Sequence, residues 1–222
     1  MHPRRAMLLA LLVASAGARR SVAQSDTDDL PARGAPSGRV GGATRGDGTA
    51  DGALALDLVA PAKGTGVTMD PVPTLFYVAS GPVALPVRFT VVLSSQAKPL
   101  VDVAIPAPAG RGMFRLATAD FALKLEPERT YVWSVAVIRD PEAPSRDLVV
   151  SAPLQRRLAP TTIVQALRDT PPEGRPGLLS RAGYWYDAVA SAIGLGTPDG
   201  QAAIDIMLRG EGLDAYAGTR PG

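Results

Sequence analysis

Carboxylate side chains are the main candidates for chemistry in this sequence, because the other usual catalytic groups are scarce. The chain of 222 residues contains one histidine, His2, and no cysteine. Histidine is the usual general base and a common metal ligand, and the cysteine thiolate is a common nucleophile. If export removes residues 1–23, neither residue type remains, and most familiar catalytic constellations cannot form.

An acidic cluster lies between two expected strands and contains Asp140, Glu142 and Asp147. Calcium prefers oxygen ligands of this kind, but it needs about six to eight of them in a set geometry. Arg139 and Arg146 accompany the carboxylates and would repel a divalent cation. We therefore interpret the segment as an ion-paired turn. Asp140 and Asp147 are weak candidates for binding a partner, and we expect no metal and no cofactor.

Asp187 is a third candidate, because it follows the aromatic run Tyr184-Trp185-Tyr186. A carboxyl group desolvated by such neighbours would have a raised pKa, although a hydrogen bond on a helix surface is the simpler account. Hydrolysis of a glycan needs only two carboxylates, so a carboxylate-dependent hydrolase stays an alternative function. A sugar-binding module is another, and it would need coplanar aromatics from the tyrosines that the expected core leaves free: Tyr77, Tyr184, Tyr186 and Tyr216.

Residues 24–53 are expected to form a flexible arm rich in glycine and alanine. Large apolar residues are almost missing from this segment, so burial cannot offset the entropy of ordering it. Within it lies Arg39-Val40-Gly41-Gly42-Ala43-Thr44-Arg45-Gly46, whose glycines could approach an anion closely, and Arg45 is a weak binding candidate. A phosphate loop needs a strand before it and a helix after it. We expect neither here, which favours a linker.

Residues 1–23 have the pattern of a signal peptide. Arg4-Arg5 precedes an apolar run, Ala6–Ala18, and the small residues Ser21-Val22-Ala23 follow, which is the order that signal peptidase recognises. The run is shorter than the roughly 20 residues that cross a bilayer. We expect cleavage near Gln24, with cleavage after Ala18 as the alternative, and no membrane span in the mature protein. The expected location is the periplasm or the medium.

The net charge argues against nucleic acid as a partner. The whole sequence carries +2 at pH 7, and the expected signal peptide holds four arginines and no acidic residue. Cleavage therefore lowers the net charge by four, to −2. No clustered basic field is left to neutralise phosphates.

The hydrophobic pattern of residues 54–158 has the period of β-strands. Thr130–Ile138 places Tyr131, Trp133 and Val135 on one face, and Val87–Leu93 alternates in the same way. Such alternation is typical of strands with one buried face. Further short strands are expected at Leu54–Val59, Thr74–Val78, Leu100–Ile105, Met113–Ala117 and Leu148–Leu154. This spacing predicts an antiparallel β-sandwich of immunoglobulin or fibronectin type, with Trp133 at the core centre and Tyr131 in a tyrosine corner.

Residues 159–222 change to a helical period and predict a small appendage of two or three helices packed on the sandwich. The expected helices are Thr161–Arg168, Leu178–Ile193 and one that begins after Thr197, which serves as its cap. The second helix should bury Trp185 in its apolar stripe and leave Tyr184 and Asp187 on the opposite face. The third helix is expected to bury Ala203, Ile206, Met207 and Leu213.

Three segments give the chain a resemblance to a known family. Arg39–Gly46, Tyr131-Val132-Trp133-Ser134 with Arg139-Asp140-Pro141, and Gly183–Ala188 resemble the bacterial family called domain of unknown function 928. The resemblance spans nearly all of the expected mature chain. It implies an exported bacterial protein and supplies no established activity, cofactor or catalytic residue.

The absence of a nucleophile and base pair, together with the sandwich-type core, indicates a protein that is not an enzyme. We expect an exported binding or structural module of the bacterial envelope, whose partner is an envelope protein or a surface component. The sequence does not specify an oligomeric state.

Export gives the first testable prediction. Mass spectrometry of the N-terminus of the protein from its own cells should find a chain that begins at or near Gln24, outside the cytoplasm, because the signal pattern ends there. An intact chain beginning at Met1, as the main species in the cytoplasm, would contradict this expectation.

Overall fold

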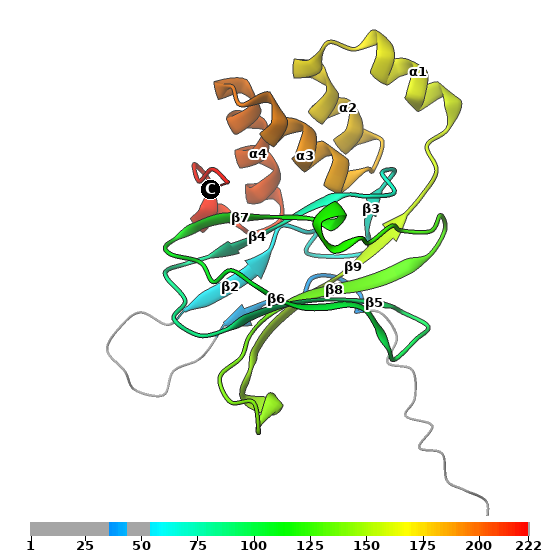
Figure 1. Ribbon diagram of the computed structural model, residues 1–222. Coiled ribbons are helices and arrows are strands. Elements are labelled where there is room, and N and C mark those ends of the chain that lie inside the picture. The colour runs from blue at the N-terminus through cyan, green and yellow to red at the C-terminus, as the bar shows by residue number, and fades with distance from the viewer. Residues whose placement is uncertain (1–35, 44–53, 222) are drawn as a thin grey trace, which may run out of the picture. The chain divides into compact units, whose positions relative to one another are not determined.

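Two β-sheets lie face to face in the computed structural model, which describes residues 36–43 and 54–221, and helices cover one side of the pair (Figure 1). One sheet has the order β1-β2-β4-β7 and the other β3-β9-β8-β5-β6. The strands are β1 Gly42–Ala43, β2 Ala55–Leu58, β3 Gly66–Thr68, β4 Thr74–Ala79, β5 Val87–Leu93, β6 Pro99–Ile105, β7 Gly112–Ala117, β8 Thr130–Val137 and β9 Leu148–Arg156.

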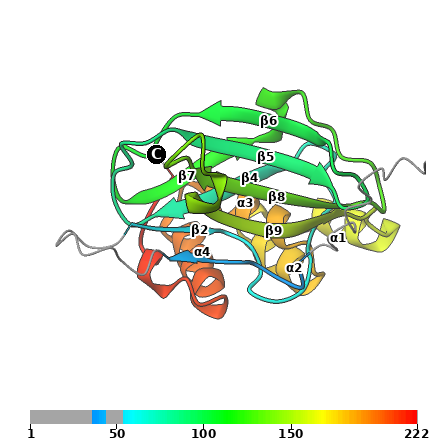
Figure 2. The ribbon, with the colours of Figure 1, turned by 90° about the horizontal axis from the view of Figure 1, so that it is seen from below.

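The longest strands of the five-stranded sheet form antiparallel pairs, as the alternating pattern predicts. Strand β8 lies between β5 and β9 (Figure 2). Its Trp133 lies opposite Val91 of β5 on one side and Ala152 of β9 on the other. The short strand β3 differs, because it pairs with β9 in parallel, with Gly66 opposite Leu154. The expectation of a purely antiparallel sandwich is therefore wrong at this edge. A strand of three buried residues is too short to show an alternating pattern.

Part of the expected flexible arm belongs to the fold. β1 pairs with β2, and Val40 forms a bridge with Ser151 of β9. The Arg39 guanidinium anchors this segment: it lies 2.9 Å from an Asp57 carboxylate oxygen and donates to the backbone oxygen of Glu211 at 2.8 Å. The glycine-containing motif at Arg39 thus has a structural role, which a composition poor in apolar residues does not reveal.

The four-stranded sheet is covered on both faces. In β4, Leu75 and Tyr77 pack into the core between the sheets, whereas Phe76 and Val78 pack against the helices. Burial on both faces explains why β4 is almost continuously apolar. The helices are α1 Thr161–Asp169, α2 Arg175–Arg181, α3 Trp185–Leu195 and α4 Pro198–Gly210, with short 3-10 turns η1 Thr118–Phe121, η2 Pro144–Arg146, η3 Pro172–Gly174 and η4 Asp214–Tyr216.

The helices differ from the expected ones in three respects. The segment predicted as one helix over 178–193 is interrupted at Gly183, whose φ of +84° lies in the left-handed region that favours glycine. The next helix, α3, continues past Gly194 and ends at Leu195, and Gly196 follows as its cap. In α4, Ile204 and Leu208 are buried with Met207, while Ile206 is 68% exposed. The cap at Thr197 is confirmed, because its hydroxyl accepts from the Gly200 amide.

Two aromatic side chains join the helical layer to the core between the sheets. Trp133 is fully buried, as expected, and its Nε1 donates to the Tyr186 hydroxyl at 2.9 Å. Tyr186 belongs to the first turn of α3, yet its ring lies in the hydrophobic cluster between the sheets, next to Trp133. A Cβ on Gly66 would lie 2.5 Å from this ring, so the tyrosine can pass β3 only because that position is glycine. The predicted tyrosine corner is confirmed by the Tyr131 hydroxyl, which accepts from the Glu126 amide.

Tyr186→Phe should destabilise the protein by about 1–3 kcal/mol, because it leaves the buried Trp133 N–H without an acceptor. Urea denaturation would measure the change. Tyr184→Phe is the matched control: its hydroxyl makes a longer bond, 3.3 Å to Leu158 O, and its loss should cost about 1 kcal/mol or less. Equal effects of the two substitutions would contradict the role of the Trp133–Tyr186 bond.

Candidate functional site

A groove of about 650 Å³ lies on the outer face of the five-stranded sheet. Figure 2 views this face, and none of the α-helices covers it. Its floor is made of short side chains in cross-strand rows: Ala136 of β8 lies opposite Arg88 of β5 and Val149 of β9, and Ser134 lies opposite Thr90. Val149 is 46% exposed. The groove therefore combines apolar and polar contact surface on a rigid sheet.

One wall of the groove is the connection between β8 and β9, which holds two of the predicted candidates, Asp140 and Asp147. Asp140 accepts from the Glu142 amide and pairs with Arg146 at 3.4 Å. Asp147 accepts from the Arg139 amide at 2.9 Å. These bonds are those of a turn with one internal ion pair, as the sequence indicates.

The wall and the floor carry more negative than positive charge. Asp102, Asp140 and Asp147 line the groove together with a single cation, Arg88. Arg88 Nη1 binds both carboxylate oxygens of Asp102, at 3.1 and 3.0 Å. In residues 36–43 and 54–221, no group of three or more histidine, cysteine or acidic side chains is placed to hold a metal ion.

Asp187 lies away from this groove, in a cleft between α1, α2 and the end of β3. Its Oδ2 accepts from the Met69 amide at 3.0 Å, and the Thr68 side chain is a second hydrogen-bond partner. Burial raises the pKa of the Asp187 carboxyl to about 6; the hydrogen bonds oppose this shift, and the charge of Asp70 adds to it. Asp187 thus links the first turn of α3 to the end of β3. The sequence suggested two possibilities for this carboxyl, a raised pKa and a hydrogen bond, and the structure has both.

The tyrosines proposed for a sugar platform do not form one. Tyr77, Tyr184, Tyr186 and Tyr216 are all at most 6% exposed. Trp185 is partly buried between the two hydrophobic clusters, and its Nε1 lies 3.5 Å from Val59 O. The expectation that the helix buries Trp185 is therefore met only in part. Sequence periodicity cannot reveal that Tyr186, rather than Trp185, reaches the sandwich core.

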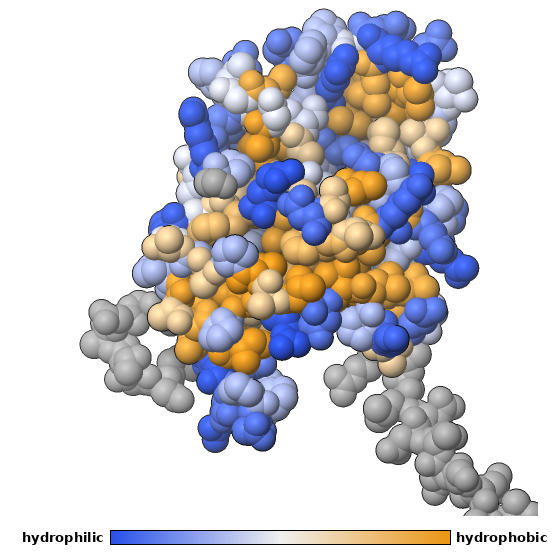
Figure 3. Space-filling model, in the orientation of Figure 1, coloured by the Kyte–Doolittle hydropathy of each residue, from blue (hydrophilic) through white to orange (hydrophobic). Residues whose placement is uncertain are grey.

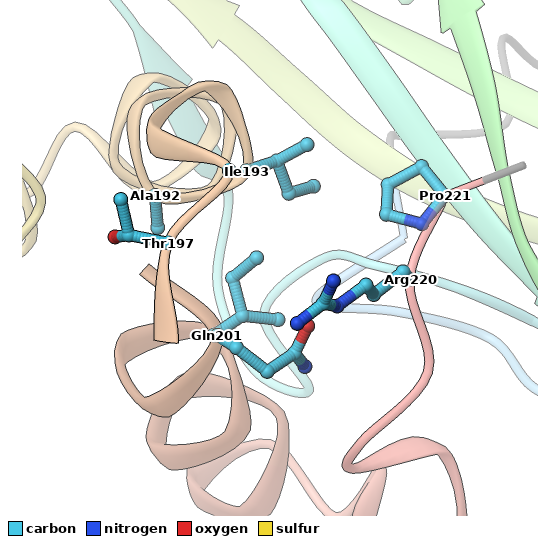
Figure 4. Close-up of a pocket in the computed structure, with 8 residues that line it drawn as sticks. Ala192, Ile193, Thr197, Gln201, Arg220 and Pro221 are labelled. Carbon is cyan, nitrogen blue, oxygen red and sulfur yellow. The ribbon is translucent and has the colours of Figure 1, made fainter. Parts of the chain in front are cut away.

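A smaller cavity of about 210 Å³ lies where α3 meets α4 (Figure 4). Ile193, Thr197 and Gln201 line it, and the segment Arg220-Pro221 closes one side. The Gln201 side chain is already bound to Asp205 and to Thr219 O. Arg45, the remaining predicted candidate, lies outside the described residues, as does the expected signal peptide.

One of the comparisons with known proteins identifies a family. The sequence model of a family described as Domain of Unknown Function (DUF928) matches residues 40–216. No curated protein and no solved structure matches the chain. Among residues 36–43 and 54–221, none of the helices has the length and apolar character needed to cross a bilayer.

The raised pKa of Asp187 predicts a pH-dependent difference between the protein and its Asp187→Asn variant. A carboxyl whose pKa rises from 3.8 when unfolded to about 6 when folded binds a proton on folding between these values. Its contribution to stability is therefore present below pH 3.8 and lost as the pH rises through about 6.

Stability of the wild-type chain relative to Asp187→Asn should increase by about 2 kcal/mol from pH 7 to pH 4. Urea denaturation of both proteins at each pH would measure this difference. Taking the difference removes the contributions of the other carboxyl groups. A difference that stays constant over this range would contradict the desolvation of Asp187.

Proposed function

Because the chain belongs to the Domain of Unknown Function 928 family, whose description assigns no activity, we propose its function from the geometry: an exported, non-catalytic module that binds a partner protein or surface component of the bacterial envelope. The binding site is the groove on the outer face of the five-stranded sheet. The observation that carries this proposal is the contrast between the two sheets, since only the four-stranded one is covered by α-helices.

The composition of the groove supports recognition of a macromolecule. Short side chains such as Ala104, Ala136 and Ser134 let a partner approach the sheet backbone, and Pro141 and Pro144 stiffen the wall beside it. Interfaces of this kind combine an apolar centre with a polar rim. Here Val149 supplies apolar surface, and the Arg88–Asp102 ion pair, in which Nη1 contacts both carboxylate oxygens, supplies polar groups.

The two alternative functions receive less support. A sugar-binding module would use exposed aromatic rings, and the four tyrosines available for this purpose are buried. A glycan hydrolase would place two carboxyl groups across a cleft. The cleft that contains Asp187, the carboxyl group with the strongly raised pKa, has that single carboxylate in its lining. We therefore place binding ahead of hydrolysis.

We further propose that the sheets belong to the immunoglobulin-like class expected from the sequence. The order β9-β8-β5 corresponds to the G-F-C strands of that class, and β2-β4-β7 corresponds to A-B-E. The Tyr131 corner lies at the start of β8, where the class places it. In disulfide-bonded members of that class a cysteine follows the corner tyrosine by two residues. Here Trp133 occupies that position and fills the core.

Site-specific photocrosslinking tests the proposed binding face. A crosslinking amino acid at Ser134 or Val149, in the protein expressed in its own cells, should yield a discrete crosslinked partner in the envelope fraction. The same amino acid at Ala202, an exposed position on α4, is the control and should yield none. A second substitution, Ala136→Arg, should abolish the crosslink from Val149, because a long charged side chain would fill the groove.

Failure to crosslink from either sheet position, or an equal yield from Ala202, would overturn the proposal. Circular dichroism of each purified variant would show that the fold is kept. Recovery of the crosslinked species in the cytoplasm would contradict the export expected from the sequence while leaving the binding face supported.

A further inference from the structure

The cleft that contains Asp187 is unrelated to the sheet groove and lies between α1, α2 and the end of β3. Its volume is about 430 Å³, which is within the range of small-molecule sites. Apolar side chains from three elements form most of its wall: Val164 and Leu167 of α1, Leu179 of α2, and Met69 after β3. Figure 3 shows apolar surface gathered over α1 and α2, with hydrophilic residues around it.

The packing of α1 leaves this apolar wall incompletely covered. α1 has apolar residues on one face, yet none of its residues is buried. Ile163 and Leu167 touch the cluster beneath the helices and stay partly exposed. Prolines flank the helix at Pro160 and Pro171. An amphipathic helix normally gains its stability by burying its apolar face, so an occupant of the cleft would complete the packing of α1.

The charged groups of the cleft are two arginines and one carboxyl group, and they come from different helices. Arg168 in the last turn of α1 and Arg175 at the start of α2 lie on either side of the α1–α2 connection. Asp187 comes from α3 and is bound to the Met69 amide, and neither arginine is among the groups that shift its pKa. The cleft therefore has two cations, an apolar wall and a half-buried carboxyl group that makes no ion pair with the arginines.

The cations retain unused hydrogen-bonding capacity. Arg168 has no hydrogen bond or ion pair with any other residue of the described part of the chain. Arg175 donates from Nε to Thr170 O at 3.1 Å, which fixes its side chain at the cleft and leaves both Nη groups for a ligand. Guanidinium groups bind carboxylates and phosphates in a bidentate manner.

We propose that the cleft between α1 and α2 binds an aliphatic anion, with the alkyl chain along Val164, Leu167 and Met69 and the acidic head on Arg168 and Arg175. Charge complementarity favours this orientation, because the arginines attract the acidic head and Asp187 repels it. A free fatty acid and the acyl chain of an acidic lipid share this chemistry. The site is independent of the sheet groove.

Calorimetric titration of the mature protein with octanoate, decanoate and dodecanoate below their micellar concentrations tests the proposal. Affinity should rise by roughly fourfold for each added methylene that the apolar wall covers. Arg168→Glu with Arg175→Glu should weaken decanoate binding by about tenfold or more. Arg209→Glu is the matched control, because Arg209 also lies in the last turn of a helix, α4, and is exposed; it should leave the affinity unchanged.

Further variants keep the test independent of folding. Arg168→Glu alone changes an exposed residue and should weaken binding in the same direction, and Leu167→Gln should reduce the dependence on chain length. Binding of free decanoate without sedimentation on vesicles of anionic phospholipid identifies a fatty acid as the ligand. Sedimentation on such vesicles that the double variant abolishes identifies a lipid.

Three results would overturn the inference. The first is no binding of any of the three acids at millimolar concentration together with no sedimentation on the vesicles. The second is an affinity that does not depend on chain length. The third is an equal loss of binding in the Arg209→Glu control and in the double variant.

Discussion

The hydrogen bond between Trp133 and Tyr186 is the contact on which the arrangement of layers depends. A buried indole N–H needs an acceptor, and the sandwich itself supplies none for Trp133 among the described residues. The acceptor comes from a helix, 53 positions later in the chain. Tyr186 also lies within hydrogen-bond distance of Pro153 O in β9, at 3.4 Å. One side chain thus links α3 to two strands of the five-stranded sheet.

This link explains several local features that otherwise look unrelated. Position 66 must be glycine for the tyrosine ring to pass, and that glycine begins β3, which pairs with β9 in parallel. Asp187, the next residue after Tyr186, holds the end of the same strand through the Met69 amide. The helices are therefore hydrogen-bonded to the sandwich. The four-stranded sheet, which lies between the helices and the five-stranded sheet, has no free face for a partner. The two faces that we propose for recognition are the outer face of the other sheet and the cleft beside α1.

Much of the sandwich could be predicted from the sequence, because one buried face gives a strand a clear period. β8 and β5 follow this rule, and Trp133 lies where the pattern places it. β3 is too short to show a period, and β1 is held by the Arg39 guanidinium and backbone hydrogen bonds, so neither has a hydrophobic pattern to detect. The break at Gly183 depends on a left-handed backbone conformation. Glycine permits this conformation, but a glycine in the sequence does not show that it is adopted.

The candidate site was only partly predictable for a related reason. The ion-paired turn with Asp140 and Asp147 follows from neighbouring charges in the sequence, whereas the groove that it borders depends on long-range strand pairing. For Asp187, the aromatic run before it correctly indicated desolvation. The same run led to a wrong prediction of which aromatic is most deeply buried. Helical periodicity favours Trp185, whereas Tyr186 is the one buried in the core between the sheets.

The central claim is that Tyr186 makes the sandwich and the α3 layer one cooperative unit. Native-state hydrogen exchange measures this directly, because it reports the free energy of opening for each amide. The account predicts that slow amides of α3 exchange with the same opening free energy as those of β8, while amides of α1 exchange through local opening. An opening free energy for α3 that is several kcal/mol below that of β8 would contradict the account.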